Sequence, residues 1–154
     1  MQEQKEVLKR VISKLSKEVL TSIIVDNLVD ENSSYVSFQP RFLKALTDEY
    51  AKVVYTFGQV LITNHEEQIK TKNDYDALLI KIADNHNTVR KENQDDYSFI
   101  LAVSYDADLK ELDQLKSMKK ELTILTSKVD KLRTEHQQMY EDLQVLKKLT
   151  YELD

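Results

Sequence analysis

The sequence contains no cysteine, no tryptophan, one glycine and one proline among its 154 residues. The lack of cysteine excludes a disulfide framework, a thiolate metal site and a cysteine nucleophile. Turn-rich β folds need Gly and Pro at their corners, and doubly wound nucleotide-binding folds need Gly beneath the phosphates, so both classes are close to excluded. With 41% hydrophobic and 32% charged residues, the chain is predicted to be a solvated all-α protein of long helices.

The net charge of the chain and the lengths of its apolar runs limit the kinds of partner that it can bind. The chain has 27 acidic and 22 basic residues, and its net charge of −5 argues against a face that neutralises nucleic-acid phosphates. The longest uncharged apolar runs, Ile23–Val25 and Phe99–Val103, are far below the roughly 20 residues that span a bilayer. The polar start lacks the apolar core of a signal peptide. We therefore expect a cytosolic or nuclear protein that binds neither nucleic acid nor membrane.

Hydrophobic periodicity divides the chain into five segments. We predict an N-terminal amphipathic helix, packed separately, over residues 1–30 and a loop over 31–40. A long helix or helix pair follows over 41–92, with a new helix starting near Pro40. Residues 93–106 form a break that contains an apolar plug, and residues 107–154 form a coiled-coil helix.

The strongest pattern lies in the last segment, where apolar positions alternate steps of three and four without interruption. This spacing satisfies the heptad criterion for a coiled coil. We call these positions the seam: Leu115, Met118, Leu122, Leu125, Val129, Leu132, His136, Met139, Leu143, Leu146, Thr150 and Leu153. The seam side chains, Thr150 excepted, are the predicted partner-binding residues.

A seam of this length, about 57 Å at 1.5 Å per residue, predicts a second helix along it. A homodimer in either direction sets like charges side by side, for example Lys128 against Arg133 in the parallel case, so the flanking charges favour a different coiled-coil protein chain. A rival reading is a self-contained bundle in which residues 41–92 fold back onto 107–154. It requires residues 93–106 to make a tight turn, for which they lack Gly and Pro.

The polar residues do not form a recognisable catalytic or metal-binding motif. His65, His86 and His136 lie on apolar stripes far apart in sequence, which predicts helix-interface roles. Asp106 and Asp108 resemble a divalent-metal pair, but helix capping explains them better because no calcium-loop pattern follows. We therefore expect a protein that is not an enzyme and has no catalytic, cofactor-binding or metal-binding residues.

Several runs resemble the family of THO complex subunit 7, over roughly residues 43–154. The likeness is carried by an Arg-Lys pair, a Gln, an acid and a Tyr before the last helix, and by a Leu-Lys-Glu-Leu-acid start to that helix. Similar runs occur elsewhere at compatible spacing. The runs are Glu49-Tyr50, Phe57–Leu61, Arg90–Tyr97, Leu109–Leu115, Val129–Leu132, Gln138–Tyr140 and Leu149–Leu153.

The resemblance implies a scaffold subunit of a nuclear complex that couples transcription to messenger-RNA processing and export. It also implies pairing along the helices with the family's partner, THO complex subunit 5. Small coiled-coil subunits of kinetochore and membrane-tethering complexes share the all-helical pattern, and the seam by itself does not separate these three functions.

Overall fold

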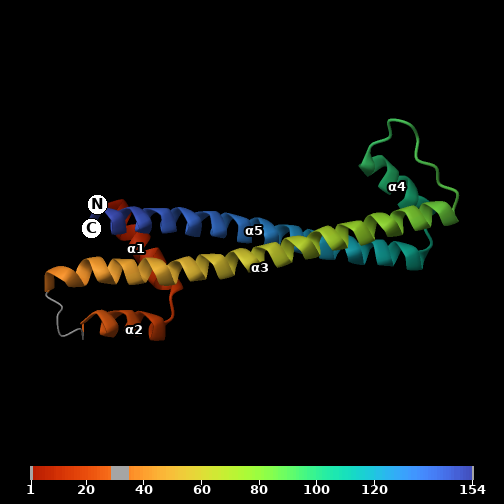
Figure 1. Cartoon of the computed structure of the whole chain (residues 1–154). Helices are drawn as coiled ribbons and strands as arrows, with labels where there is room; N and C mark the ends of the chain where they lie inside the picture. Colours follow the sequence, from red (N-terminus) through yellow and green to blue (C-terminus); the bar gives the residue numbers. More distant parts are fainter. Residues whose placement is uncertain (1, 29–34, 154) are drawn as a thin grey trace. The chain divides into compact units, whose positions relative to one another are not determined.

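A computed structural model describes residues 2–28 and 35–153 of the chain (Figure 1). These residues form five α-helices and no strand, which confirms the all-α class with long helices. The helices are α1 (Gln2–Lys14), α2 (Lys17–Leu28), α3 (Tyr35–Asn85), α4 (Asp96–Asp106) and α5 (Leu109–Leu153).

The chain divides into two compact units, and α3 and α5 each contribute to both. Unit 1 comprises Met1–Leu61 and Leu132–Asp154, and unit 2 comprises Ile62–Lys131.

The core of unit 1 forms where α1 packs against α3 and α5. Val7 and Val11 of α1 are 2% and 0% exposed. They lie four residues apart and therefore on the same face of the helix. The remaining core residues are Leu15, Leu46, Tyr50, Val54, Met139, Leu143 and Leu146. The separate N-terminal helix thus packs against the long C-terminal helix.

The core of unit 2 forms between the second half of α3, the start of α5 and the short helix α4 (Figure 1). Phe99 and Val103 of α4 are buried four residues apart. They pack with Tyr75, Leu79, Ile82, Ala83 and Leu115.

Within each unit, α3 and α5 run antiparallel. In unit 1, Thr47 bonds Thr150 through the two hydroxyls at 3.0 Å, and Phe57 stacks on His136. In unit 2, the Gln68 amide donates to the Thr126 hydroxyl at 3.0 Å, and a second contact joins His86 to Glu111. In both units the residue number on α5 falls as the number of the contacting residue on the α3 side rises, as antiparallel pairing requires.

The N-terminal segment contains two helices, although the sequence predicted one over residues 1–30. The Ser16 hydroxyl accepts a hydrogen bond from the Val19 amide at 3.2 Å, which is the bond an N-cap residue makes. α1 therefore ends at Lys14 and α2 begins at Lys17. The prediction of one helix was wrong because Ser16 caps a new helix inside a hydrophobic pattern that is otherwise continuous.

The third helix begins at Tyr35, upstream of the start predicted near Pro40. Of the predicted loop 31–40, residues 31–34 lie outside the described residues and the rest are helical. Proline removes one amide donor, whose acceptor here would be the Val36 carbonyl in the first turn. That carbonyl therefore lacks its helical donor, but the helix continues through Pro40, so Pro40 does not set the boundary.

Helix α3 is a single continuous helix, whereas the sequence left open a long helix or a helix pair over residues 41–92. It ends at Asn85 rather than at residue 92. Asn87 adopts a left-handed φ of 57°, and the Thr88 amide donates to the Ala83 carbonyl at 2.8 Å. This pattern is the Schellman motif that closes a helix, with Asn in the position usually taken by Gly.

The apolar segment after this turn is the helix α4. Asp95 caps it, because its carboxylate accepts from the Ser98 amide at 2.7 Å, and this bond lowers the pKa of Asp95. Helix α5 starts with a capping box in which the Asp108 carboxylate accepts from the Glu111 amide at 2.8 Å and Glu111 accepts from the Asp108 amide at 3.0 Å. The capping role predicted for Asp108 is confirmed. Asp106 does not cap α5, because it is the last residue of α4 and its carboxylate accepts a hydrogen bond from the Thr88 hydroxyl at 2.6 Å.

Candidate partner-binding groove

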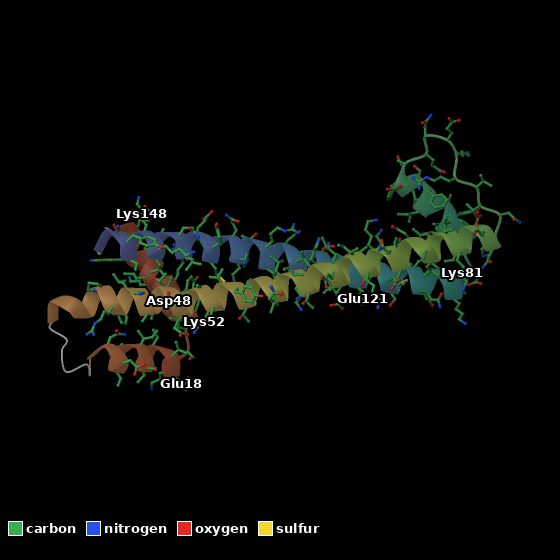
Figure 2. The ribbon with its side chains drawn as sticks, in the orientation of Figure 1. Glu18, Asp48, Lys52, Lys81, Glu121 and Lys148 are labelled. Carbon is green, nitrogen blue, oxygen red and sulfur yellow. The ribbon has the colours of Figure 1, made fainter. Side chains whose placement is uncertain are left out.

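Unit 2 contains a groove of about 890 Å³ between α3, α4 and α5. Its apolar lining comes from all three helices, and Leu79 and Phe99 at its floor are 4% and 8% exposed. The apolar lining residues are Tyr75, Leu79, Ile80, Phe99, Ile100 and Leu122. Charged side chains such as Lys81 and Glu121 lie exposed elsewhere on α3 and α5 (Figure 2).

Helix α4 forms one wall of the groove, and Arg90 ties the connection before it to this wall. The Arg90 guanidinium donates to the Asp96 carboxylate at 2.5 Å and to the Gln94 carbonyl at 3.2 Å. It also lies 5.1 Å from the centre of the Phe99 ring, within the range of a cation–π contact. Together with the Asp95 cap, these contacts fix the start of α4 against the groove.

The rim of the groove carries both paired and unpaired charges. Lys72 pairs with Asp76 at 3.2 Å, and Arg90 pairs with Asp96. Lys119 and Lys131, both on α5, also line the groove. Within residues 2–28 and 35–153, neither of these two ammonium groups has a carboxylate within ion-pair distance.

The outer face of α4 exposes a row of large side chains, which we call the α4 stripe: Tyr97, Leu101 and Tyr105. Their exposed fractions are 68%, 51% and 90%. Because they are spaced four residues apart, they lie along one face of the helix. Ile100, which lines the groove, is a helical neighbour of Tyr97, so the stripe and the groove adjoin.

The seam faces the interior of the units. Six seam residues are buried: Leu115, Leu125, Val129, Met139, Leu143 and Leu146. Met118, Leu122, Leu132, His136 and Thr150 are half-buried, and the Leu153 side chain lies outside the described residues. Within each unit α3 of the same chain packs along the seam and covers it without a second chain. That the seam residues bind a partner protein stays a prediction. The chain reverses through the Schellman turn, α4 and the α5 capping box, and no tight turn is required.

The three histidines have different environments. His65 is exposed. The His86 imidazole bonds the Glu111 carboxylate at 2.7 Å, which raises the pKa of His86, and nearby Asp106 and Asp108 act in the same direction. The pKa of Glu111 is lowered, first by the Asp108 amide and then by His86.

His136 fills the space beside the only glycine of the chain. Its ring stacks nearly parallel to Phe57, with ring centres 6.2 Å apart. A Cβ atom on Gly58 would lie 3.0 Å from the His136 Nε2 atom, closer than ordinary packing allows. Gly58 therefore lets α3 pack closely against the His136 ring of the seam. This close contact accounts for a glycine inside a long helix.

Sequence reasoning missed a buried ion pair in unit 1. Asp142 occupies a position that flanks the seam, where a charged side chain is expected to be exposed, yet it is 2% exposed. Its two carboxylate oxygens accept from Arg10 of α1 at 2.9 Å each, and Gln138 donates a third bond at 3.0 Å. Lys14, one turn after Arg10 on α1, pairs with Glu135 of α5. The missed signal was the basic pair four residues apart on α1.

The Tyr50 hydroxyl is buried in the same region. It has no hydrogen-bond partner among the described residues. Burial, and then the Asp142 charge, raise the pKa of Tyr50 to about 12. Its neutral phenol is therefore stable at physiological pH, and we assign Tyr50 a packing role.

Comparison with family models, with curated proteins and with solved structures gives no match. No helix in the part of the chain that the structure describes is long and apolar enough to cross a membrane. Within the same residues, no group of three or more His, Asp and Glu side chains is placed to hold a metal ion.

Proposed function

We propose that this chain is a non-catalytic scaffold subunit of a multiprotein complex, and that it binds a different protein chain through α4 and the groove beside it. The observation that carries this proposal is the α4 stripe. Two tyrosines and a leucine on one face of an eleven-residue helix are more than half exposed. Contiguous exposed apolar side chains on a soluble protein mark interaction surfaces more often than single exposed ones do.

The chemistry of the stripe also suits a protein partner. Tyrosine is enriched among the residues that contribute most to binding at protein interfaces, because its ring buries a large apolar area and its hydroxyl can stay wet. The opposite face of α4 is anchored by Phe99 and Val103. The stripe is thus presented on a fixed helix, which limits the entropy lost on binding.

The resemblance to THO complex subunit 7 supports the choice of complex. The run Arg90–Tyr97 that carries part of this likeness contains Arg90 and Asp96 of the groove rim and Tyr97 of the α4 stripe. We therefore propose a nuclear scaffold that couples transcription to messenger-RNA processing and export, with THO complex subunit 5 as the partner. A kinetochore or membrane-tethering subunit is the alternative.

Co-purification of the tagged full chain from its native cells tests the proposal. The test variant is Y97Q/L101Q/Y105Q, since glutamine keeps helix propensity while it removes apolar surface. The matched control is Y55Q/I62Q/Y151Q, which also removes two tyrosines and one aliphatic side chain at exposed helical positions. We expect the stripe variant to lose its co-purified subunits and the control to keep them.

The co-purified proteins also decide between the complexes. Export factors support the THO assignment, whereas kinetochore or tether subunits support the alternative. If the stripe variant and the control retain the same proteins in equal amounts, the proposed binding surface is wrong. Charges placed in the seam are less informative, because Leu125 is buried on its own chain and its replacement would unfold unit 2.

A further inference from the structure

We infer that the groove of unit 2 binds an acidic amphipathic helix of the partner protein. This inference rests on the proposed function and specifies the partner chemistry at the same site.

The walls of the groove favour a helix over an extended peptide. All three walls are helices, whose backbone amides and carbonyls are bonded within the helix. An extended segment in this groove would bury its own backbone groups without a strand edge to pair with. A helix satisfies its backbone internally and can bury one apolar face, as in other helix-in-groove interfaces.

The lining of the groove matches one face of such a helix. Leu79, Ile80, Ile100 and Leu122 offer aliphatic contacts from three directions, and Ile80 is still 56% exposed in the free chain. A volume of about 890 Å³ accommodates apolar side chains from several successive turns but not a complete helix of 10–12 Å diameter. The outer face of the bound helix would therefore stay in water and carry polar residues.

The charges on the rim determine the sign of the charge that the partner helix should carry. Lys72 and Arg90 are already neutralised by Asp76 and Asp96. Asp130, the remaining rim carboxylate, is itself engaged in a contact within the chain. The rim carries four cations, Lys72, Arg90, Lys119 and Lys131, against three carboxylates, Asp76, Asp96 and Asp130, which is an excess of one positive charge although the chain as a whole carries −5. Among the described residues, Lys119 and Lys131 are the rim cations that form no ion pair.

The spacing of these two lysines sets the spacing of the acids. From Lys119 to Lys131, α5 rises about 18 Å at 1.5 Å per residue. Two carboxylates three helical turns apart, at i and i+11, span about 16.5 Å and lie on nearly the same face. Apolar residues at i+4 and i+7 lie between them on that face and would enter the groove. Complementary charges at the two ends would fix the register of the bound helix.

Two labelled helical peptides test the inference against the full chain. The acidic probe is an alanine-based 18-residue peptide with Leu at i+4 and i+7 and Glu at i and i+11. The basic probe has Lys in place of both Glu. We expect fluorescence anisotropy at low salt to give a Kd for the acidic probe at least tenfold below that of the basic probe.

The charge-reversal variant K119E/K131E should invert this preference. The control K116E/K128E makes the same charge change at two exposed lysines of the α5 part of unit 2 that do not line the groove. The control should bind both probes as the unchanged chain does. Circular dichroism should give the same melting temperature for both variants, since all four lysines are exposed.

The outcomes separate the inference from the proposed function. Equal affinity for the two probes, no saturable binding of either, or an unchanged preference in K119E/K131E overturns the acidic-helix inference. Self-association that K119E/K131E abolishes would assign the groove to a second copy and overturn it as well. In each of these cases, loss of co-purified subunits from the α4 stripe variant would still support the scaffold function.

Discussion

Replacing Arg10 by methionine should destabilise unit 1 far more than an ordinary surface charge change does. Arg10 donates two hydrogen bonds of 2.9 Å to the Asp142 carboxylate. The Asp142 side chain is 3% exposed, whereas that of Arg10 is 45% exposed. In the R10M variant the carboxylate stays buried and keeps only the bond from Gln138.

The expected loss of stability in R10M lies between two limits. An exposed ion pair contributes less than about 1 kcal/mol, and removing one partner of a fully buried pair costs about 3–5 kcal/mol. Because Arg10 is half exposed and Gln138 still donates to the carboxylate, we expect a loss of about 2 kcal/mol. For a chain of this length that corresponds to a fall in Tm of about 4–8 °C.

Thermal unfolding and hydrogen exchange of the α1 amides measure the effect. The control is K9M on the same helix, which removes an exposed Lys9–Glu6 pair of 3.6 Å and should cost less than about 0.5 kcal/mol. The double variant R10M/D142M should recover most of the loss, because the buried carboxylate is removed as well. Equal effects of R10M and K9M, or no recovery in the double variant, would refute the reasoning.

Three further predictions concern other polar and small residues. Tyr50→Phe should stabilise the chain by about 1 kcal/mol in chemical denaturation, because it removes a buried hydroxyl without a partner among the described residues; destabilisation would indicate a hidden partner. Gly58→Ala alone should change stability by less than about 0.5 kcal/mol, because the helix gain of about 1 kcal/mol is offset by crowding on His136. In a His136→Ala background it should stabilise by about 1 kcal/mol, and equal effects in both backgrounds would contradict the packing. The NMR titration of His86 should give a pKa above 6.5 that Glu111→Gln lowers; since the folded value is raised, the stability from this contact is complete below about pH 6.5 and is lost as the pH rises through the folded value.

The seam residues were predictable because a heptad pattern directly reflects which face of a helix is buried. Leu115, Val129 and Leu146 are all buried as their spacing requires. The heptad pattern does not show which helix covers the seam, because a helix of the same chain and a helix of another chain would bury the same positions. The sequence therefore predicted which face of α5 is buried, but it could not predict that α3 of the same chain packs against that face.

The helix boundaries show a similar division. Asp108 was predictable as a cap because it directly precedes a strongly periodic helix. Ser16 and Asn87 set the ends of α1 and α3 through single hydrogen bonds and one left-handed residue. Such local signals are weak beside a continuing hydrophobic pattern, so periodicity alone placed these boundaries incorrectly.

The groove could not be predicted from residue spacing. Its walls join residues near Leu79, Phe99 and Leu122, which only the reversal of the chain brings together. The sequence did identify an apolar plug within residues 93–106, but it did not separate the buried residues of that segment from those of the α4 stripe. That separation depends on where α4 contacts its neighbours.

The contact between α1 and α5 also determines the order of events during synthesis. Arg10 and Asp142 are 132 positions apart, whereas His86 and Glu111 of unit 2 are 25 apart. Contacts between distant positions close larger loops and form more slowly. At translation rates of 5–20 residues per second, α1 waits on the order of ten seconds for its docking surface on α5 to be made. During that interval Val7 and Val11 lack their contacts with Met139, Leu143 and Leu146 of α5. Site-specific crosslinking from Val11 on stalled ribosomes should therefore capture chaperones until residue 146 has emerged.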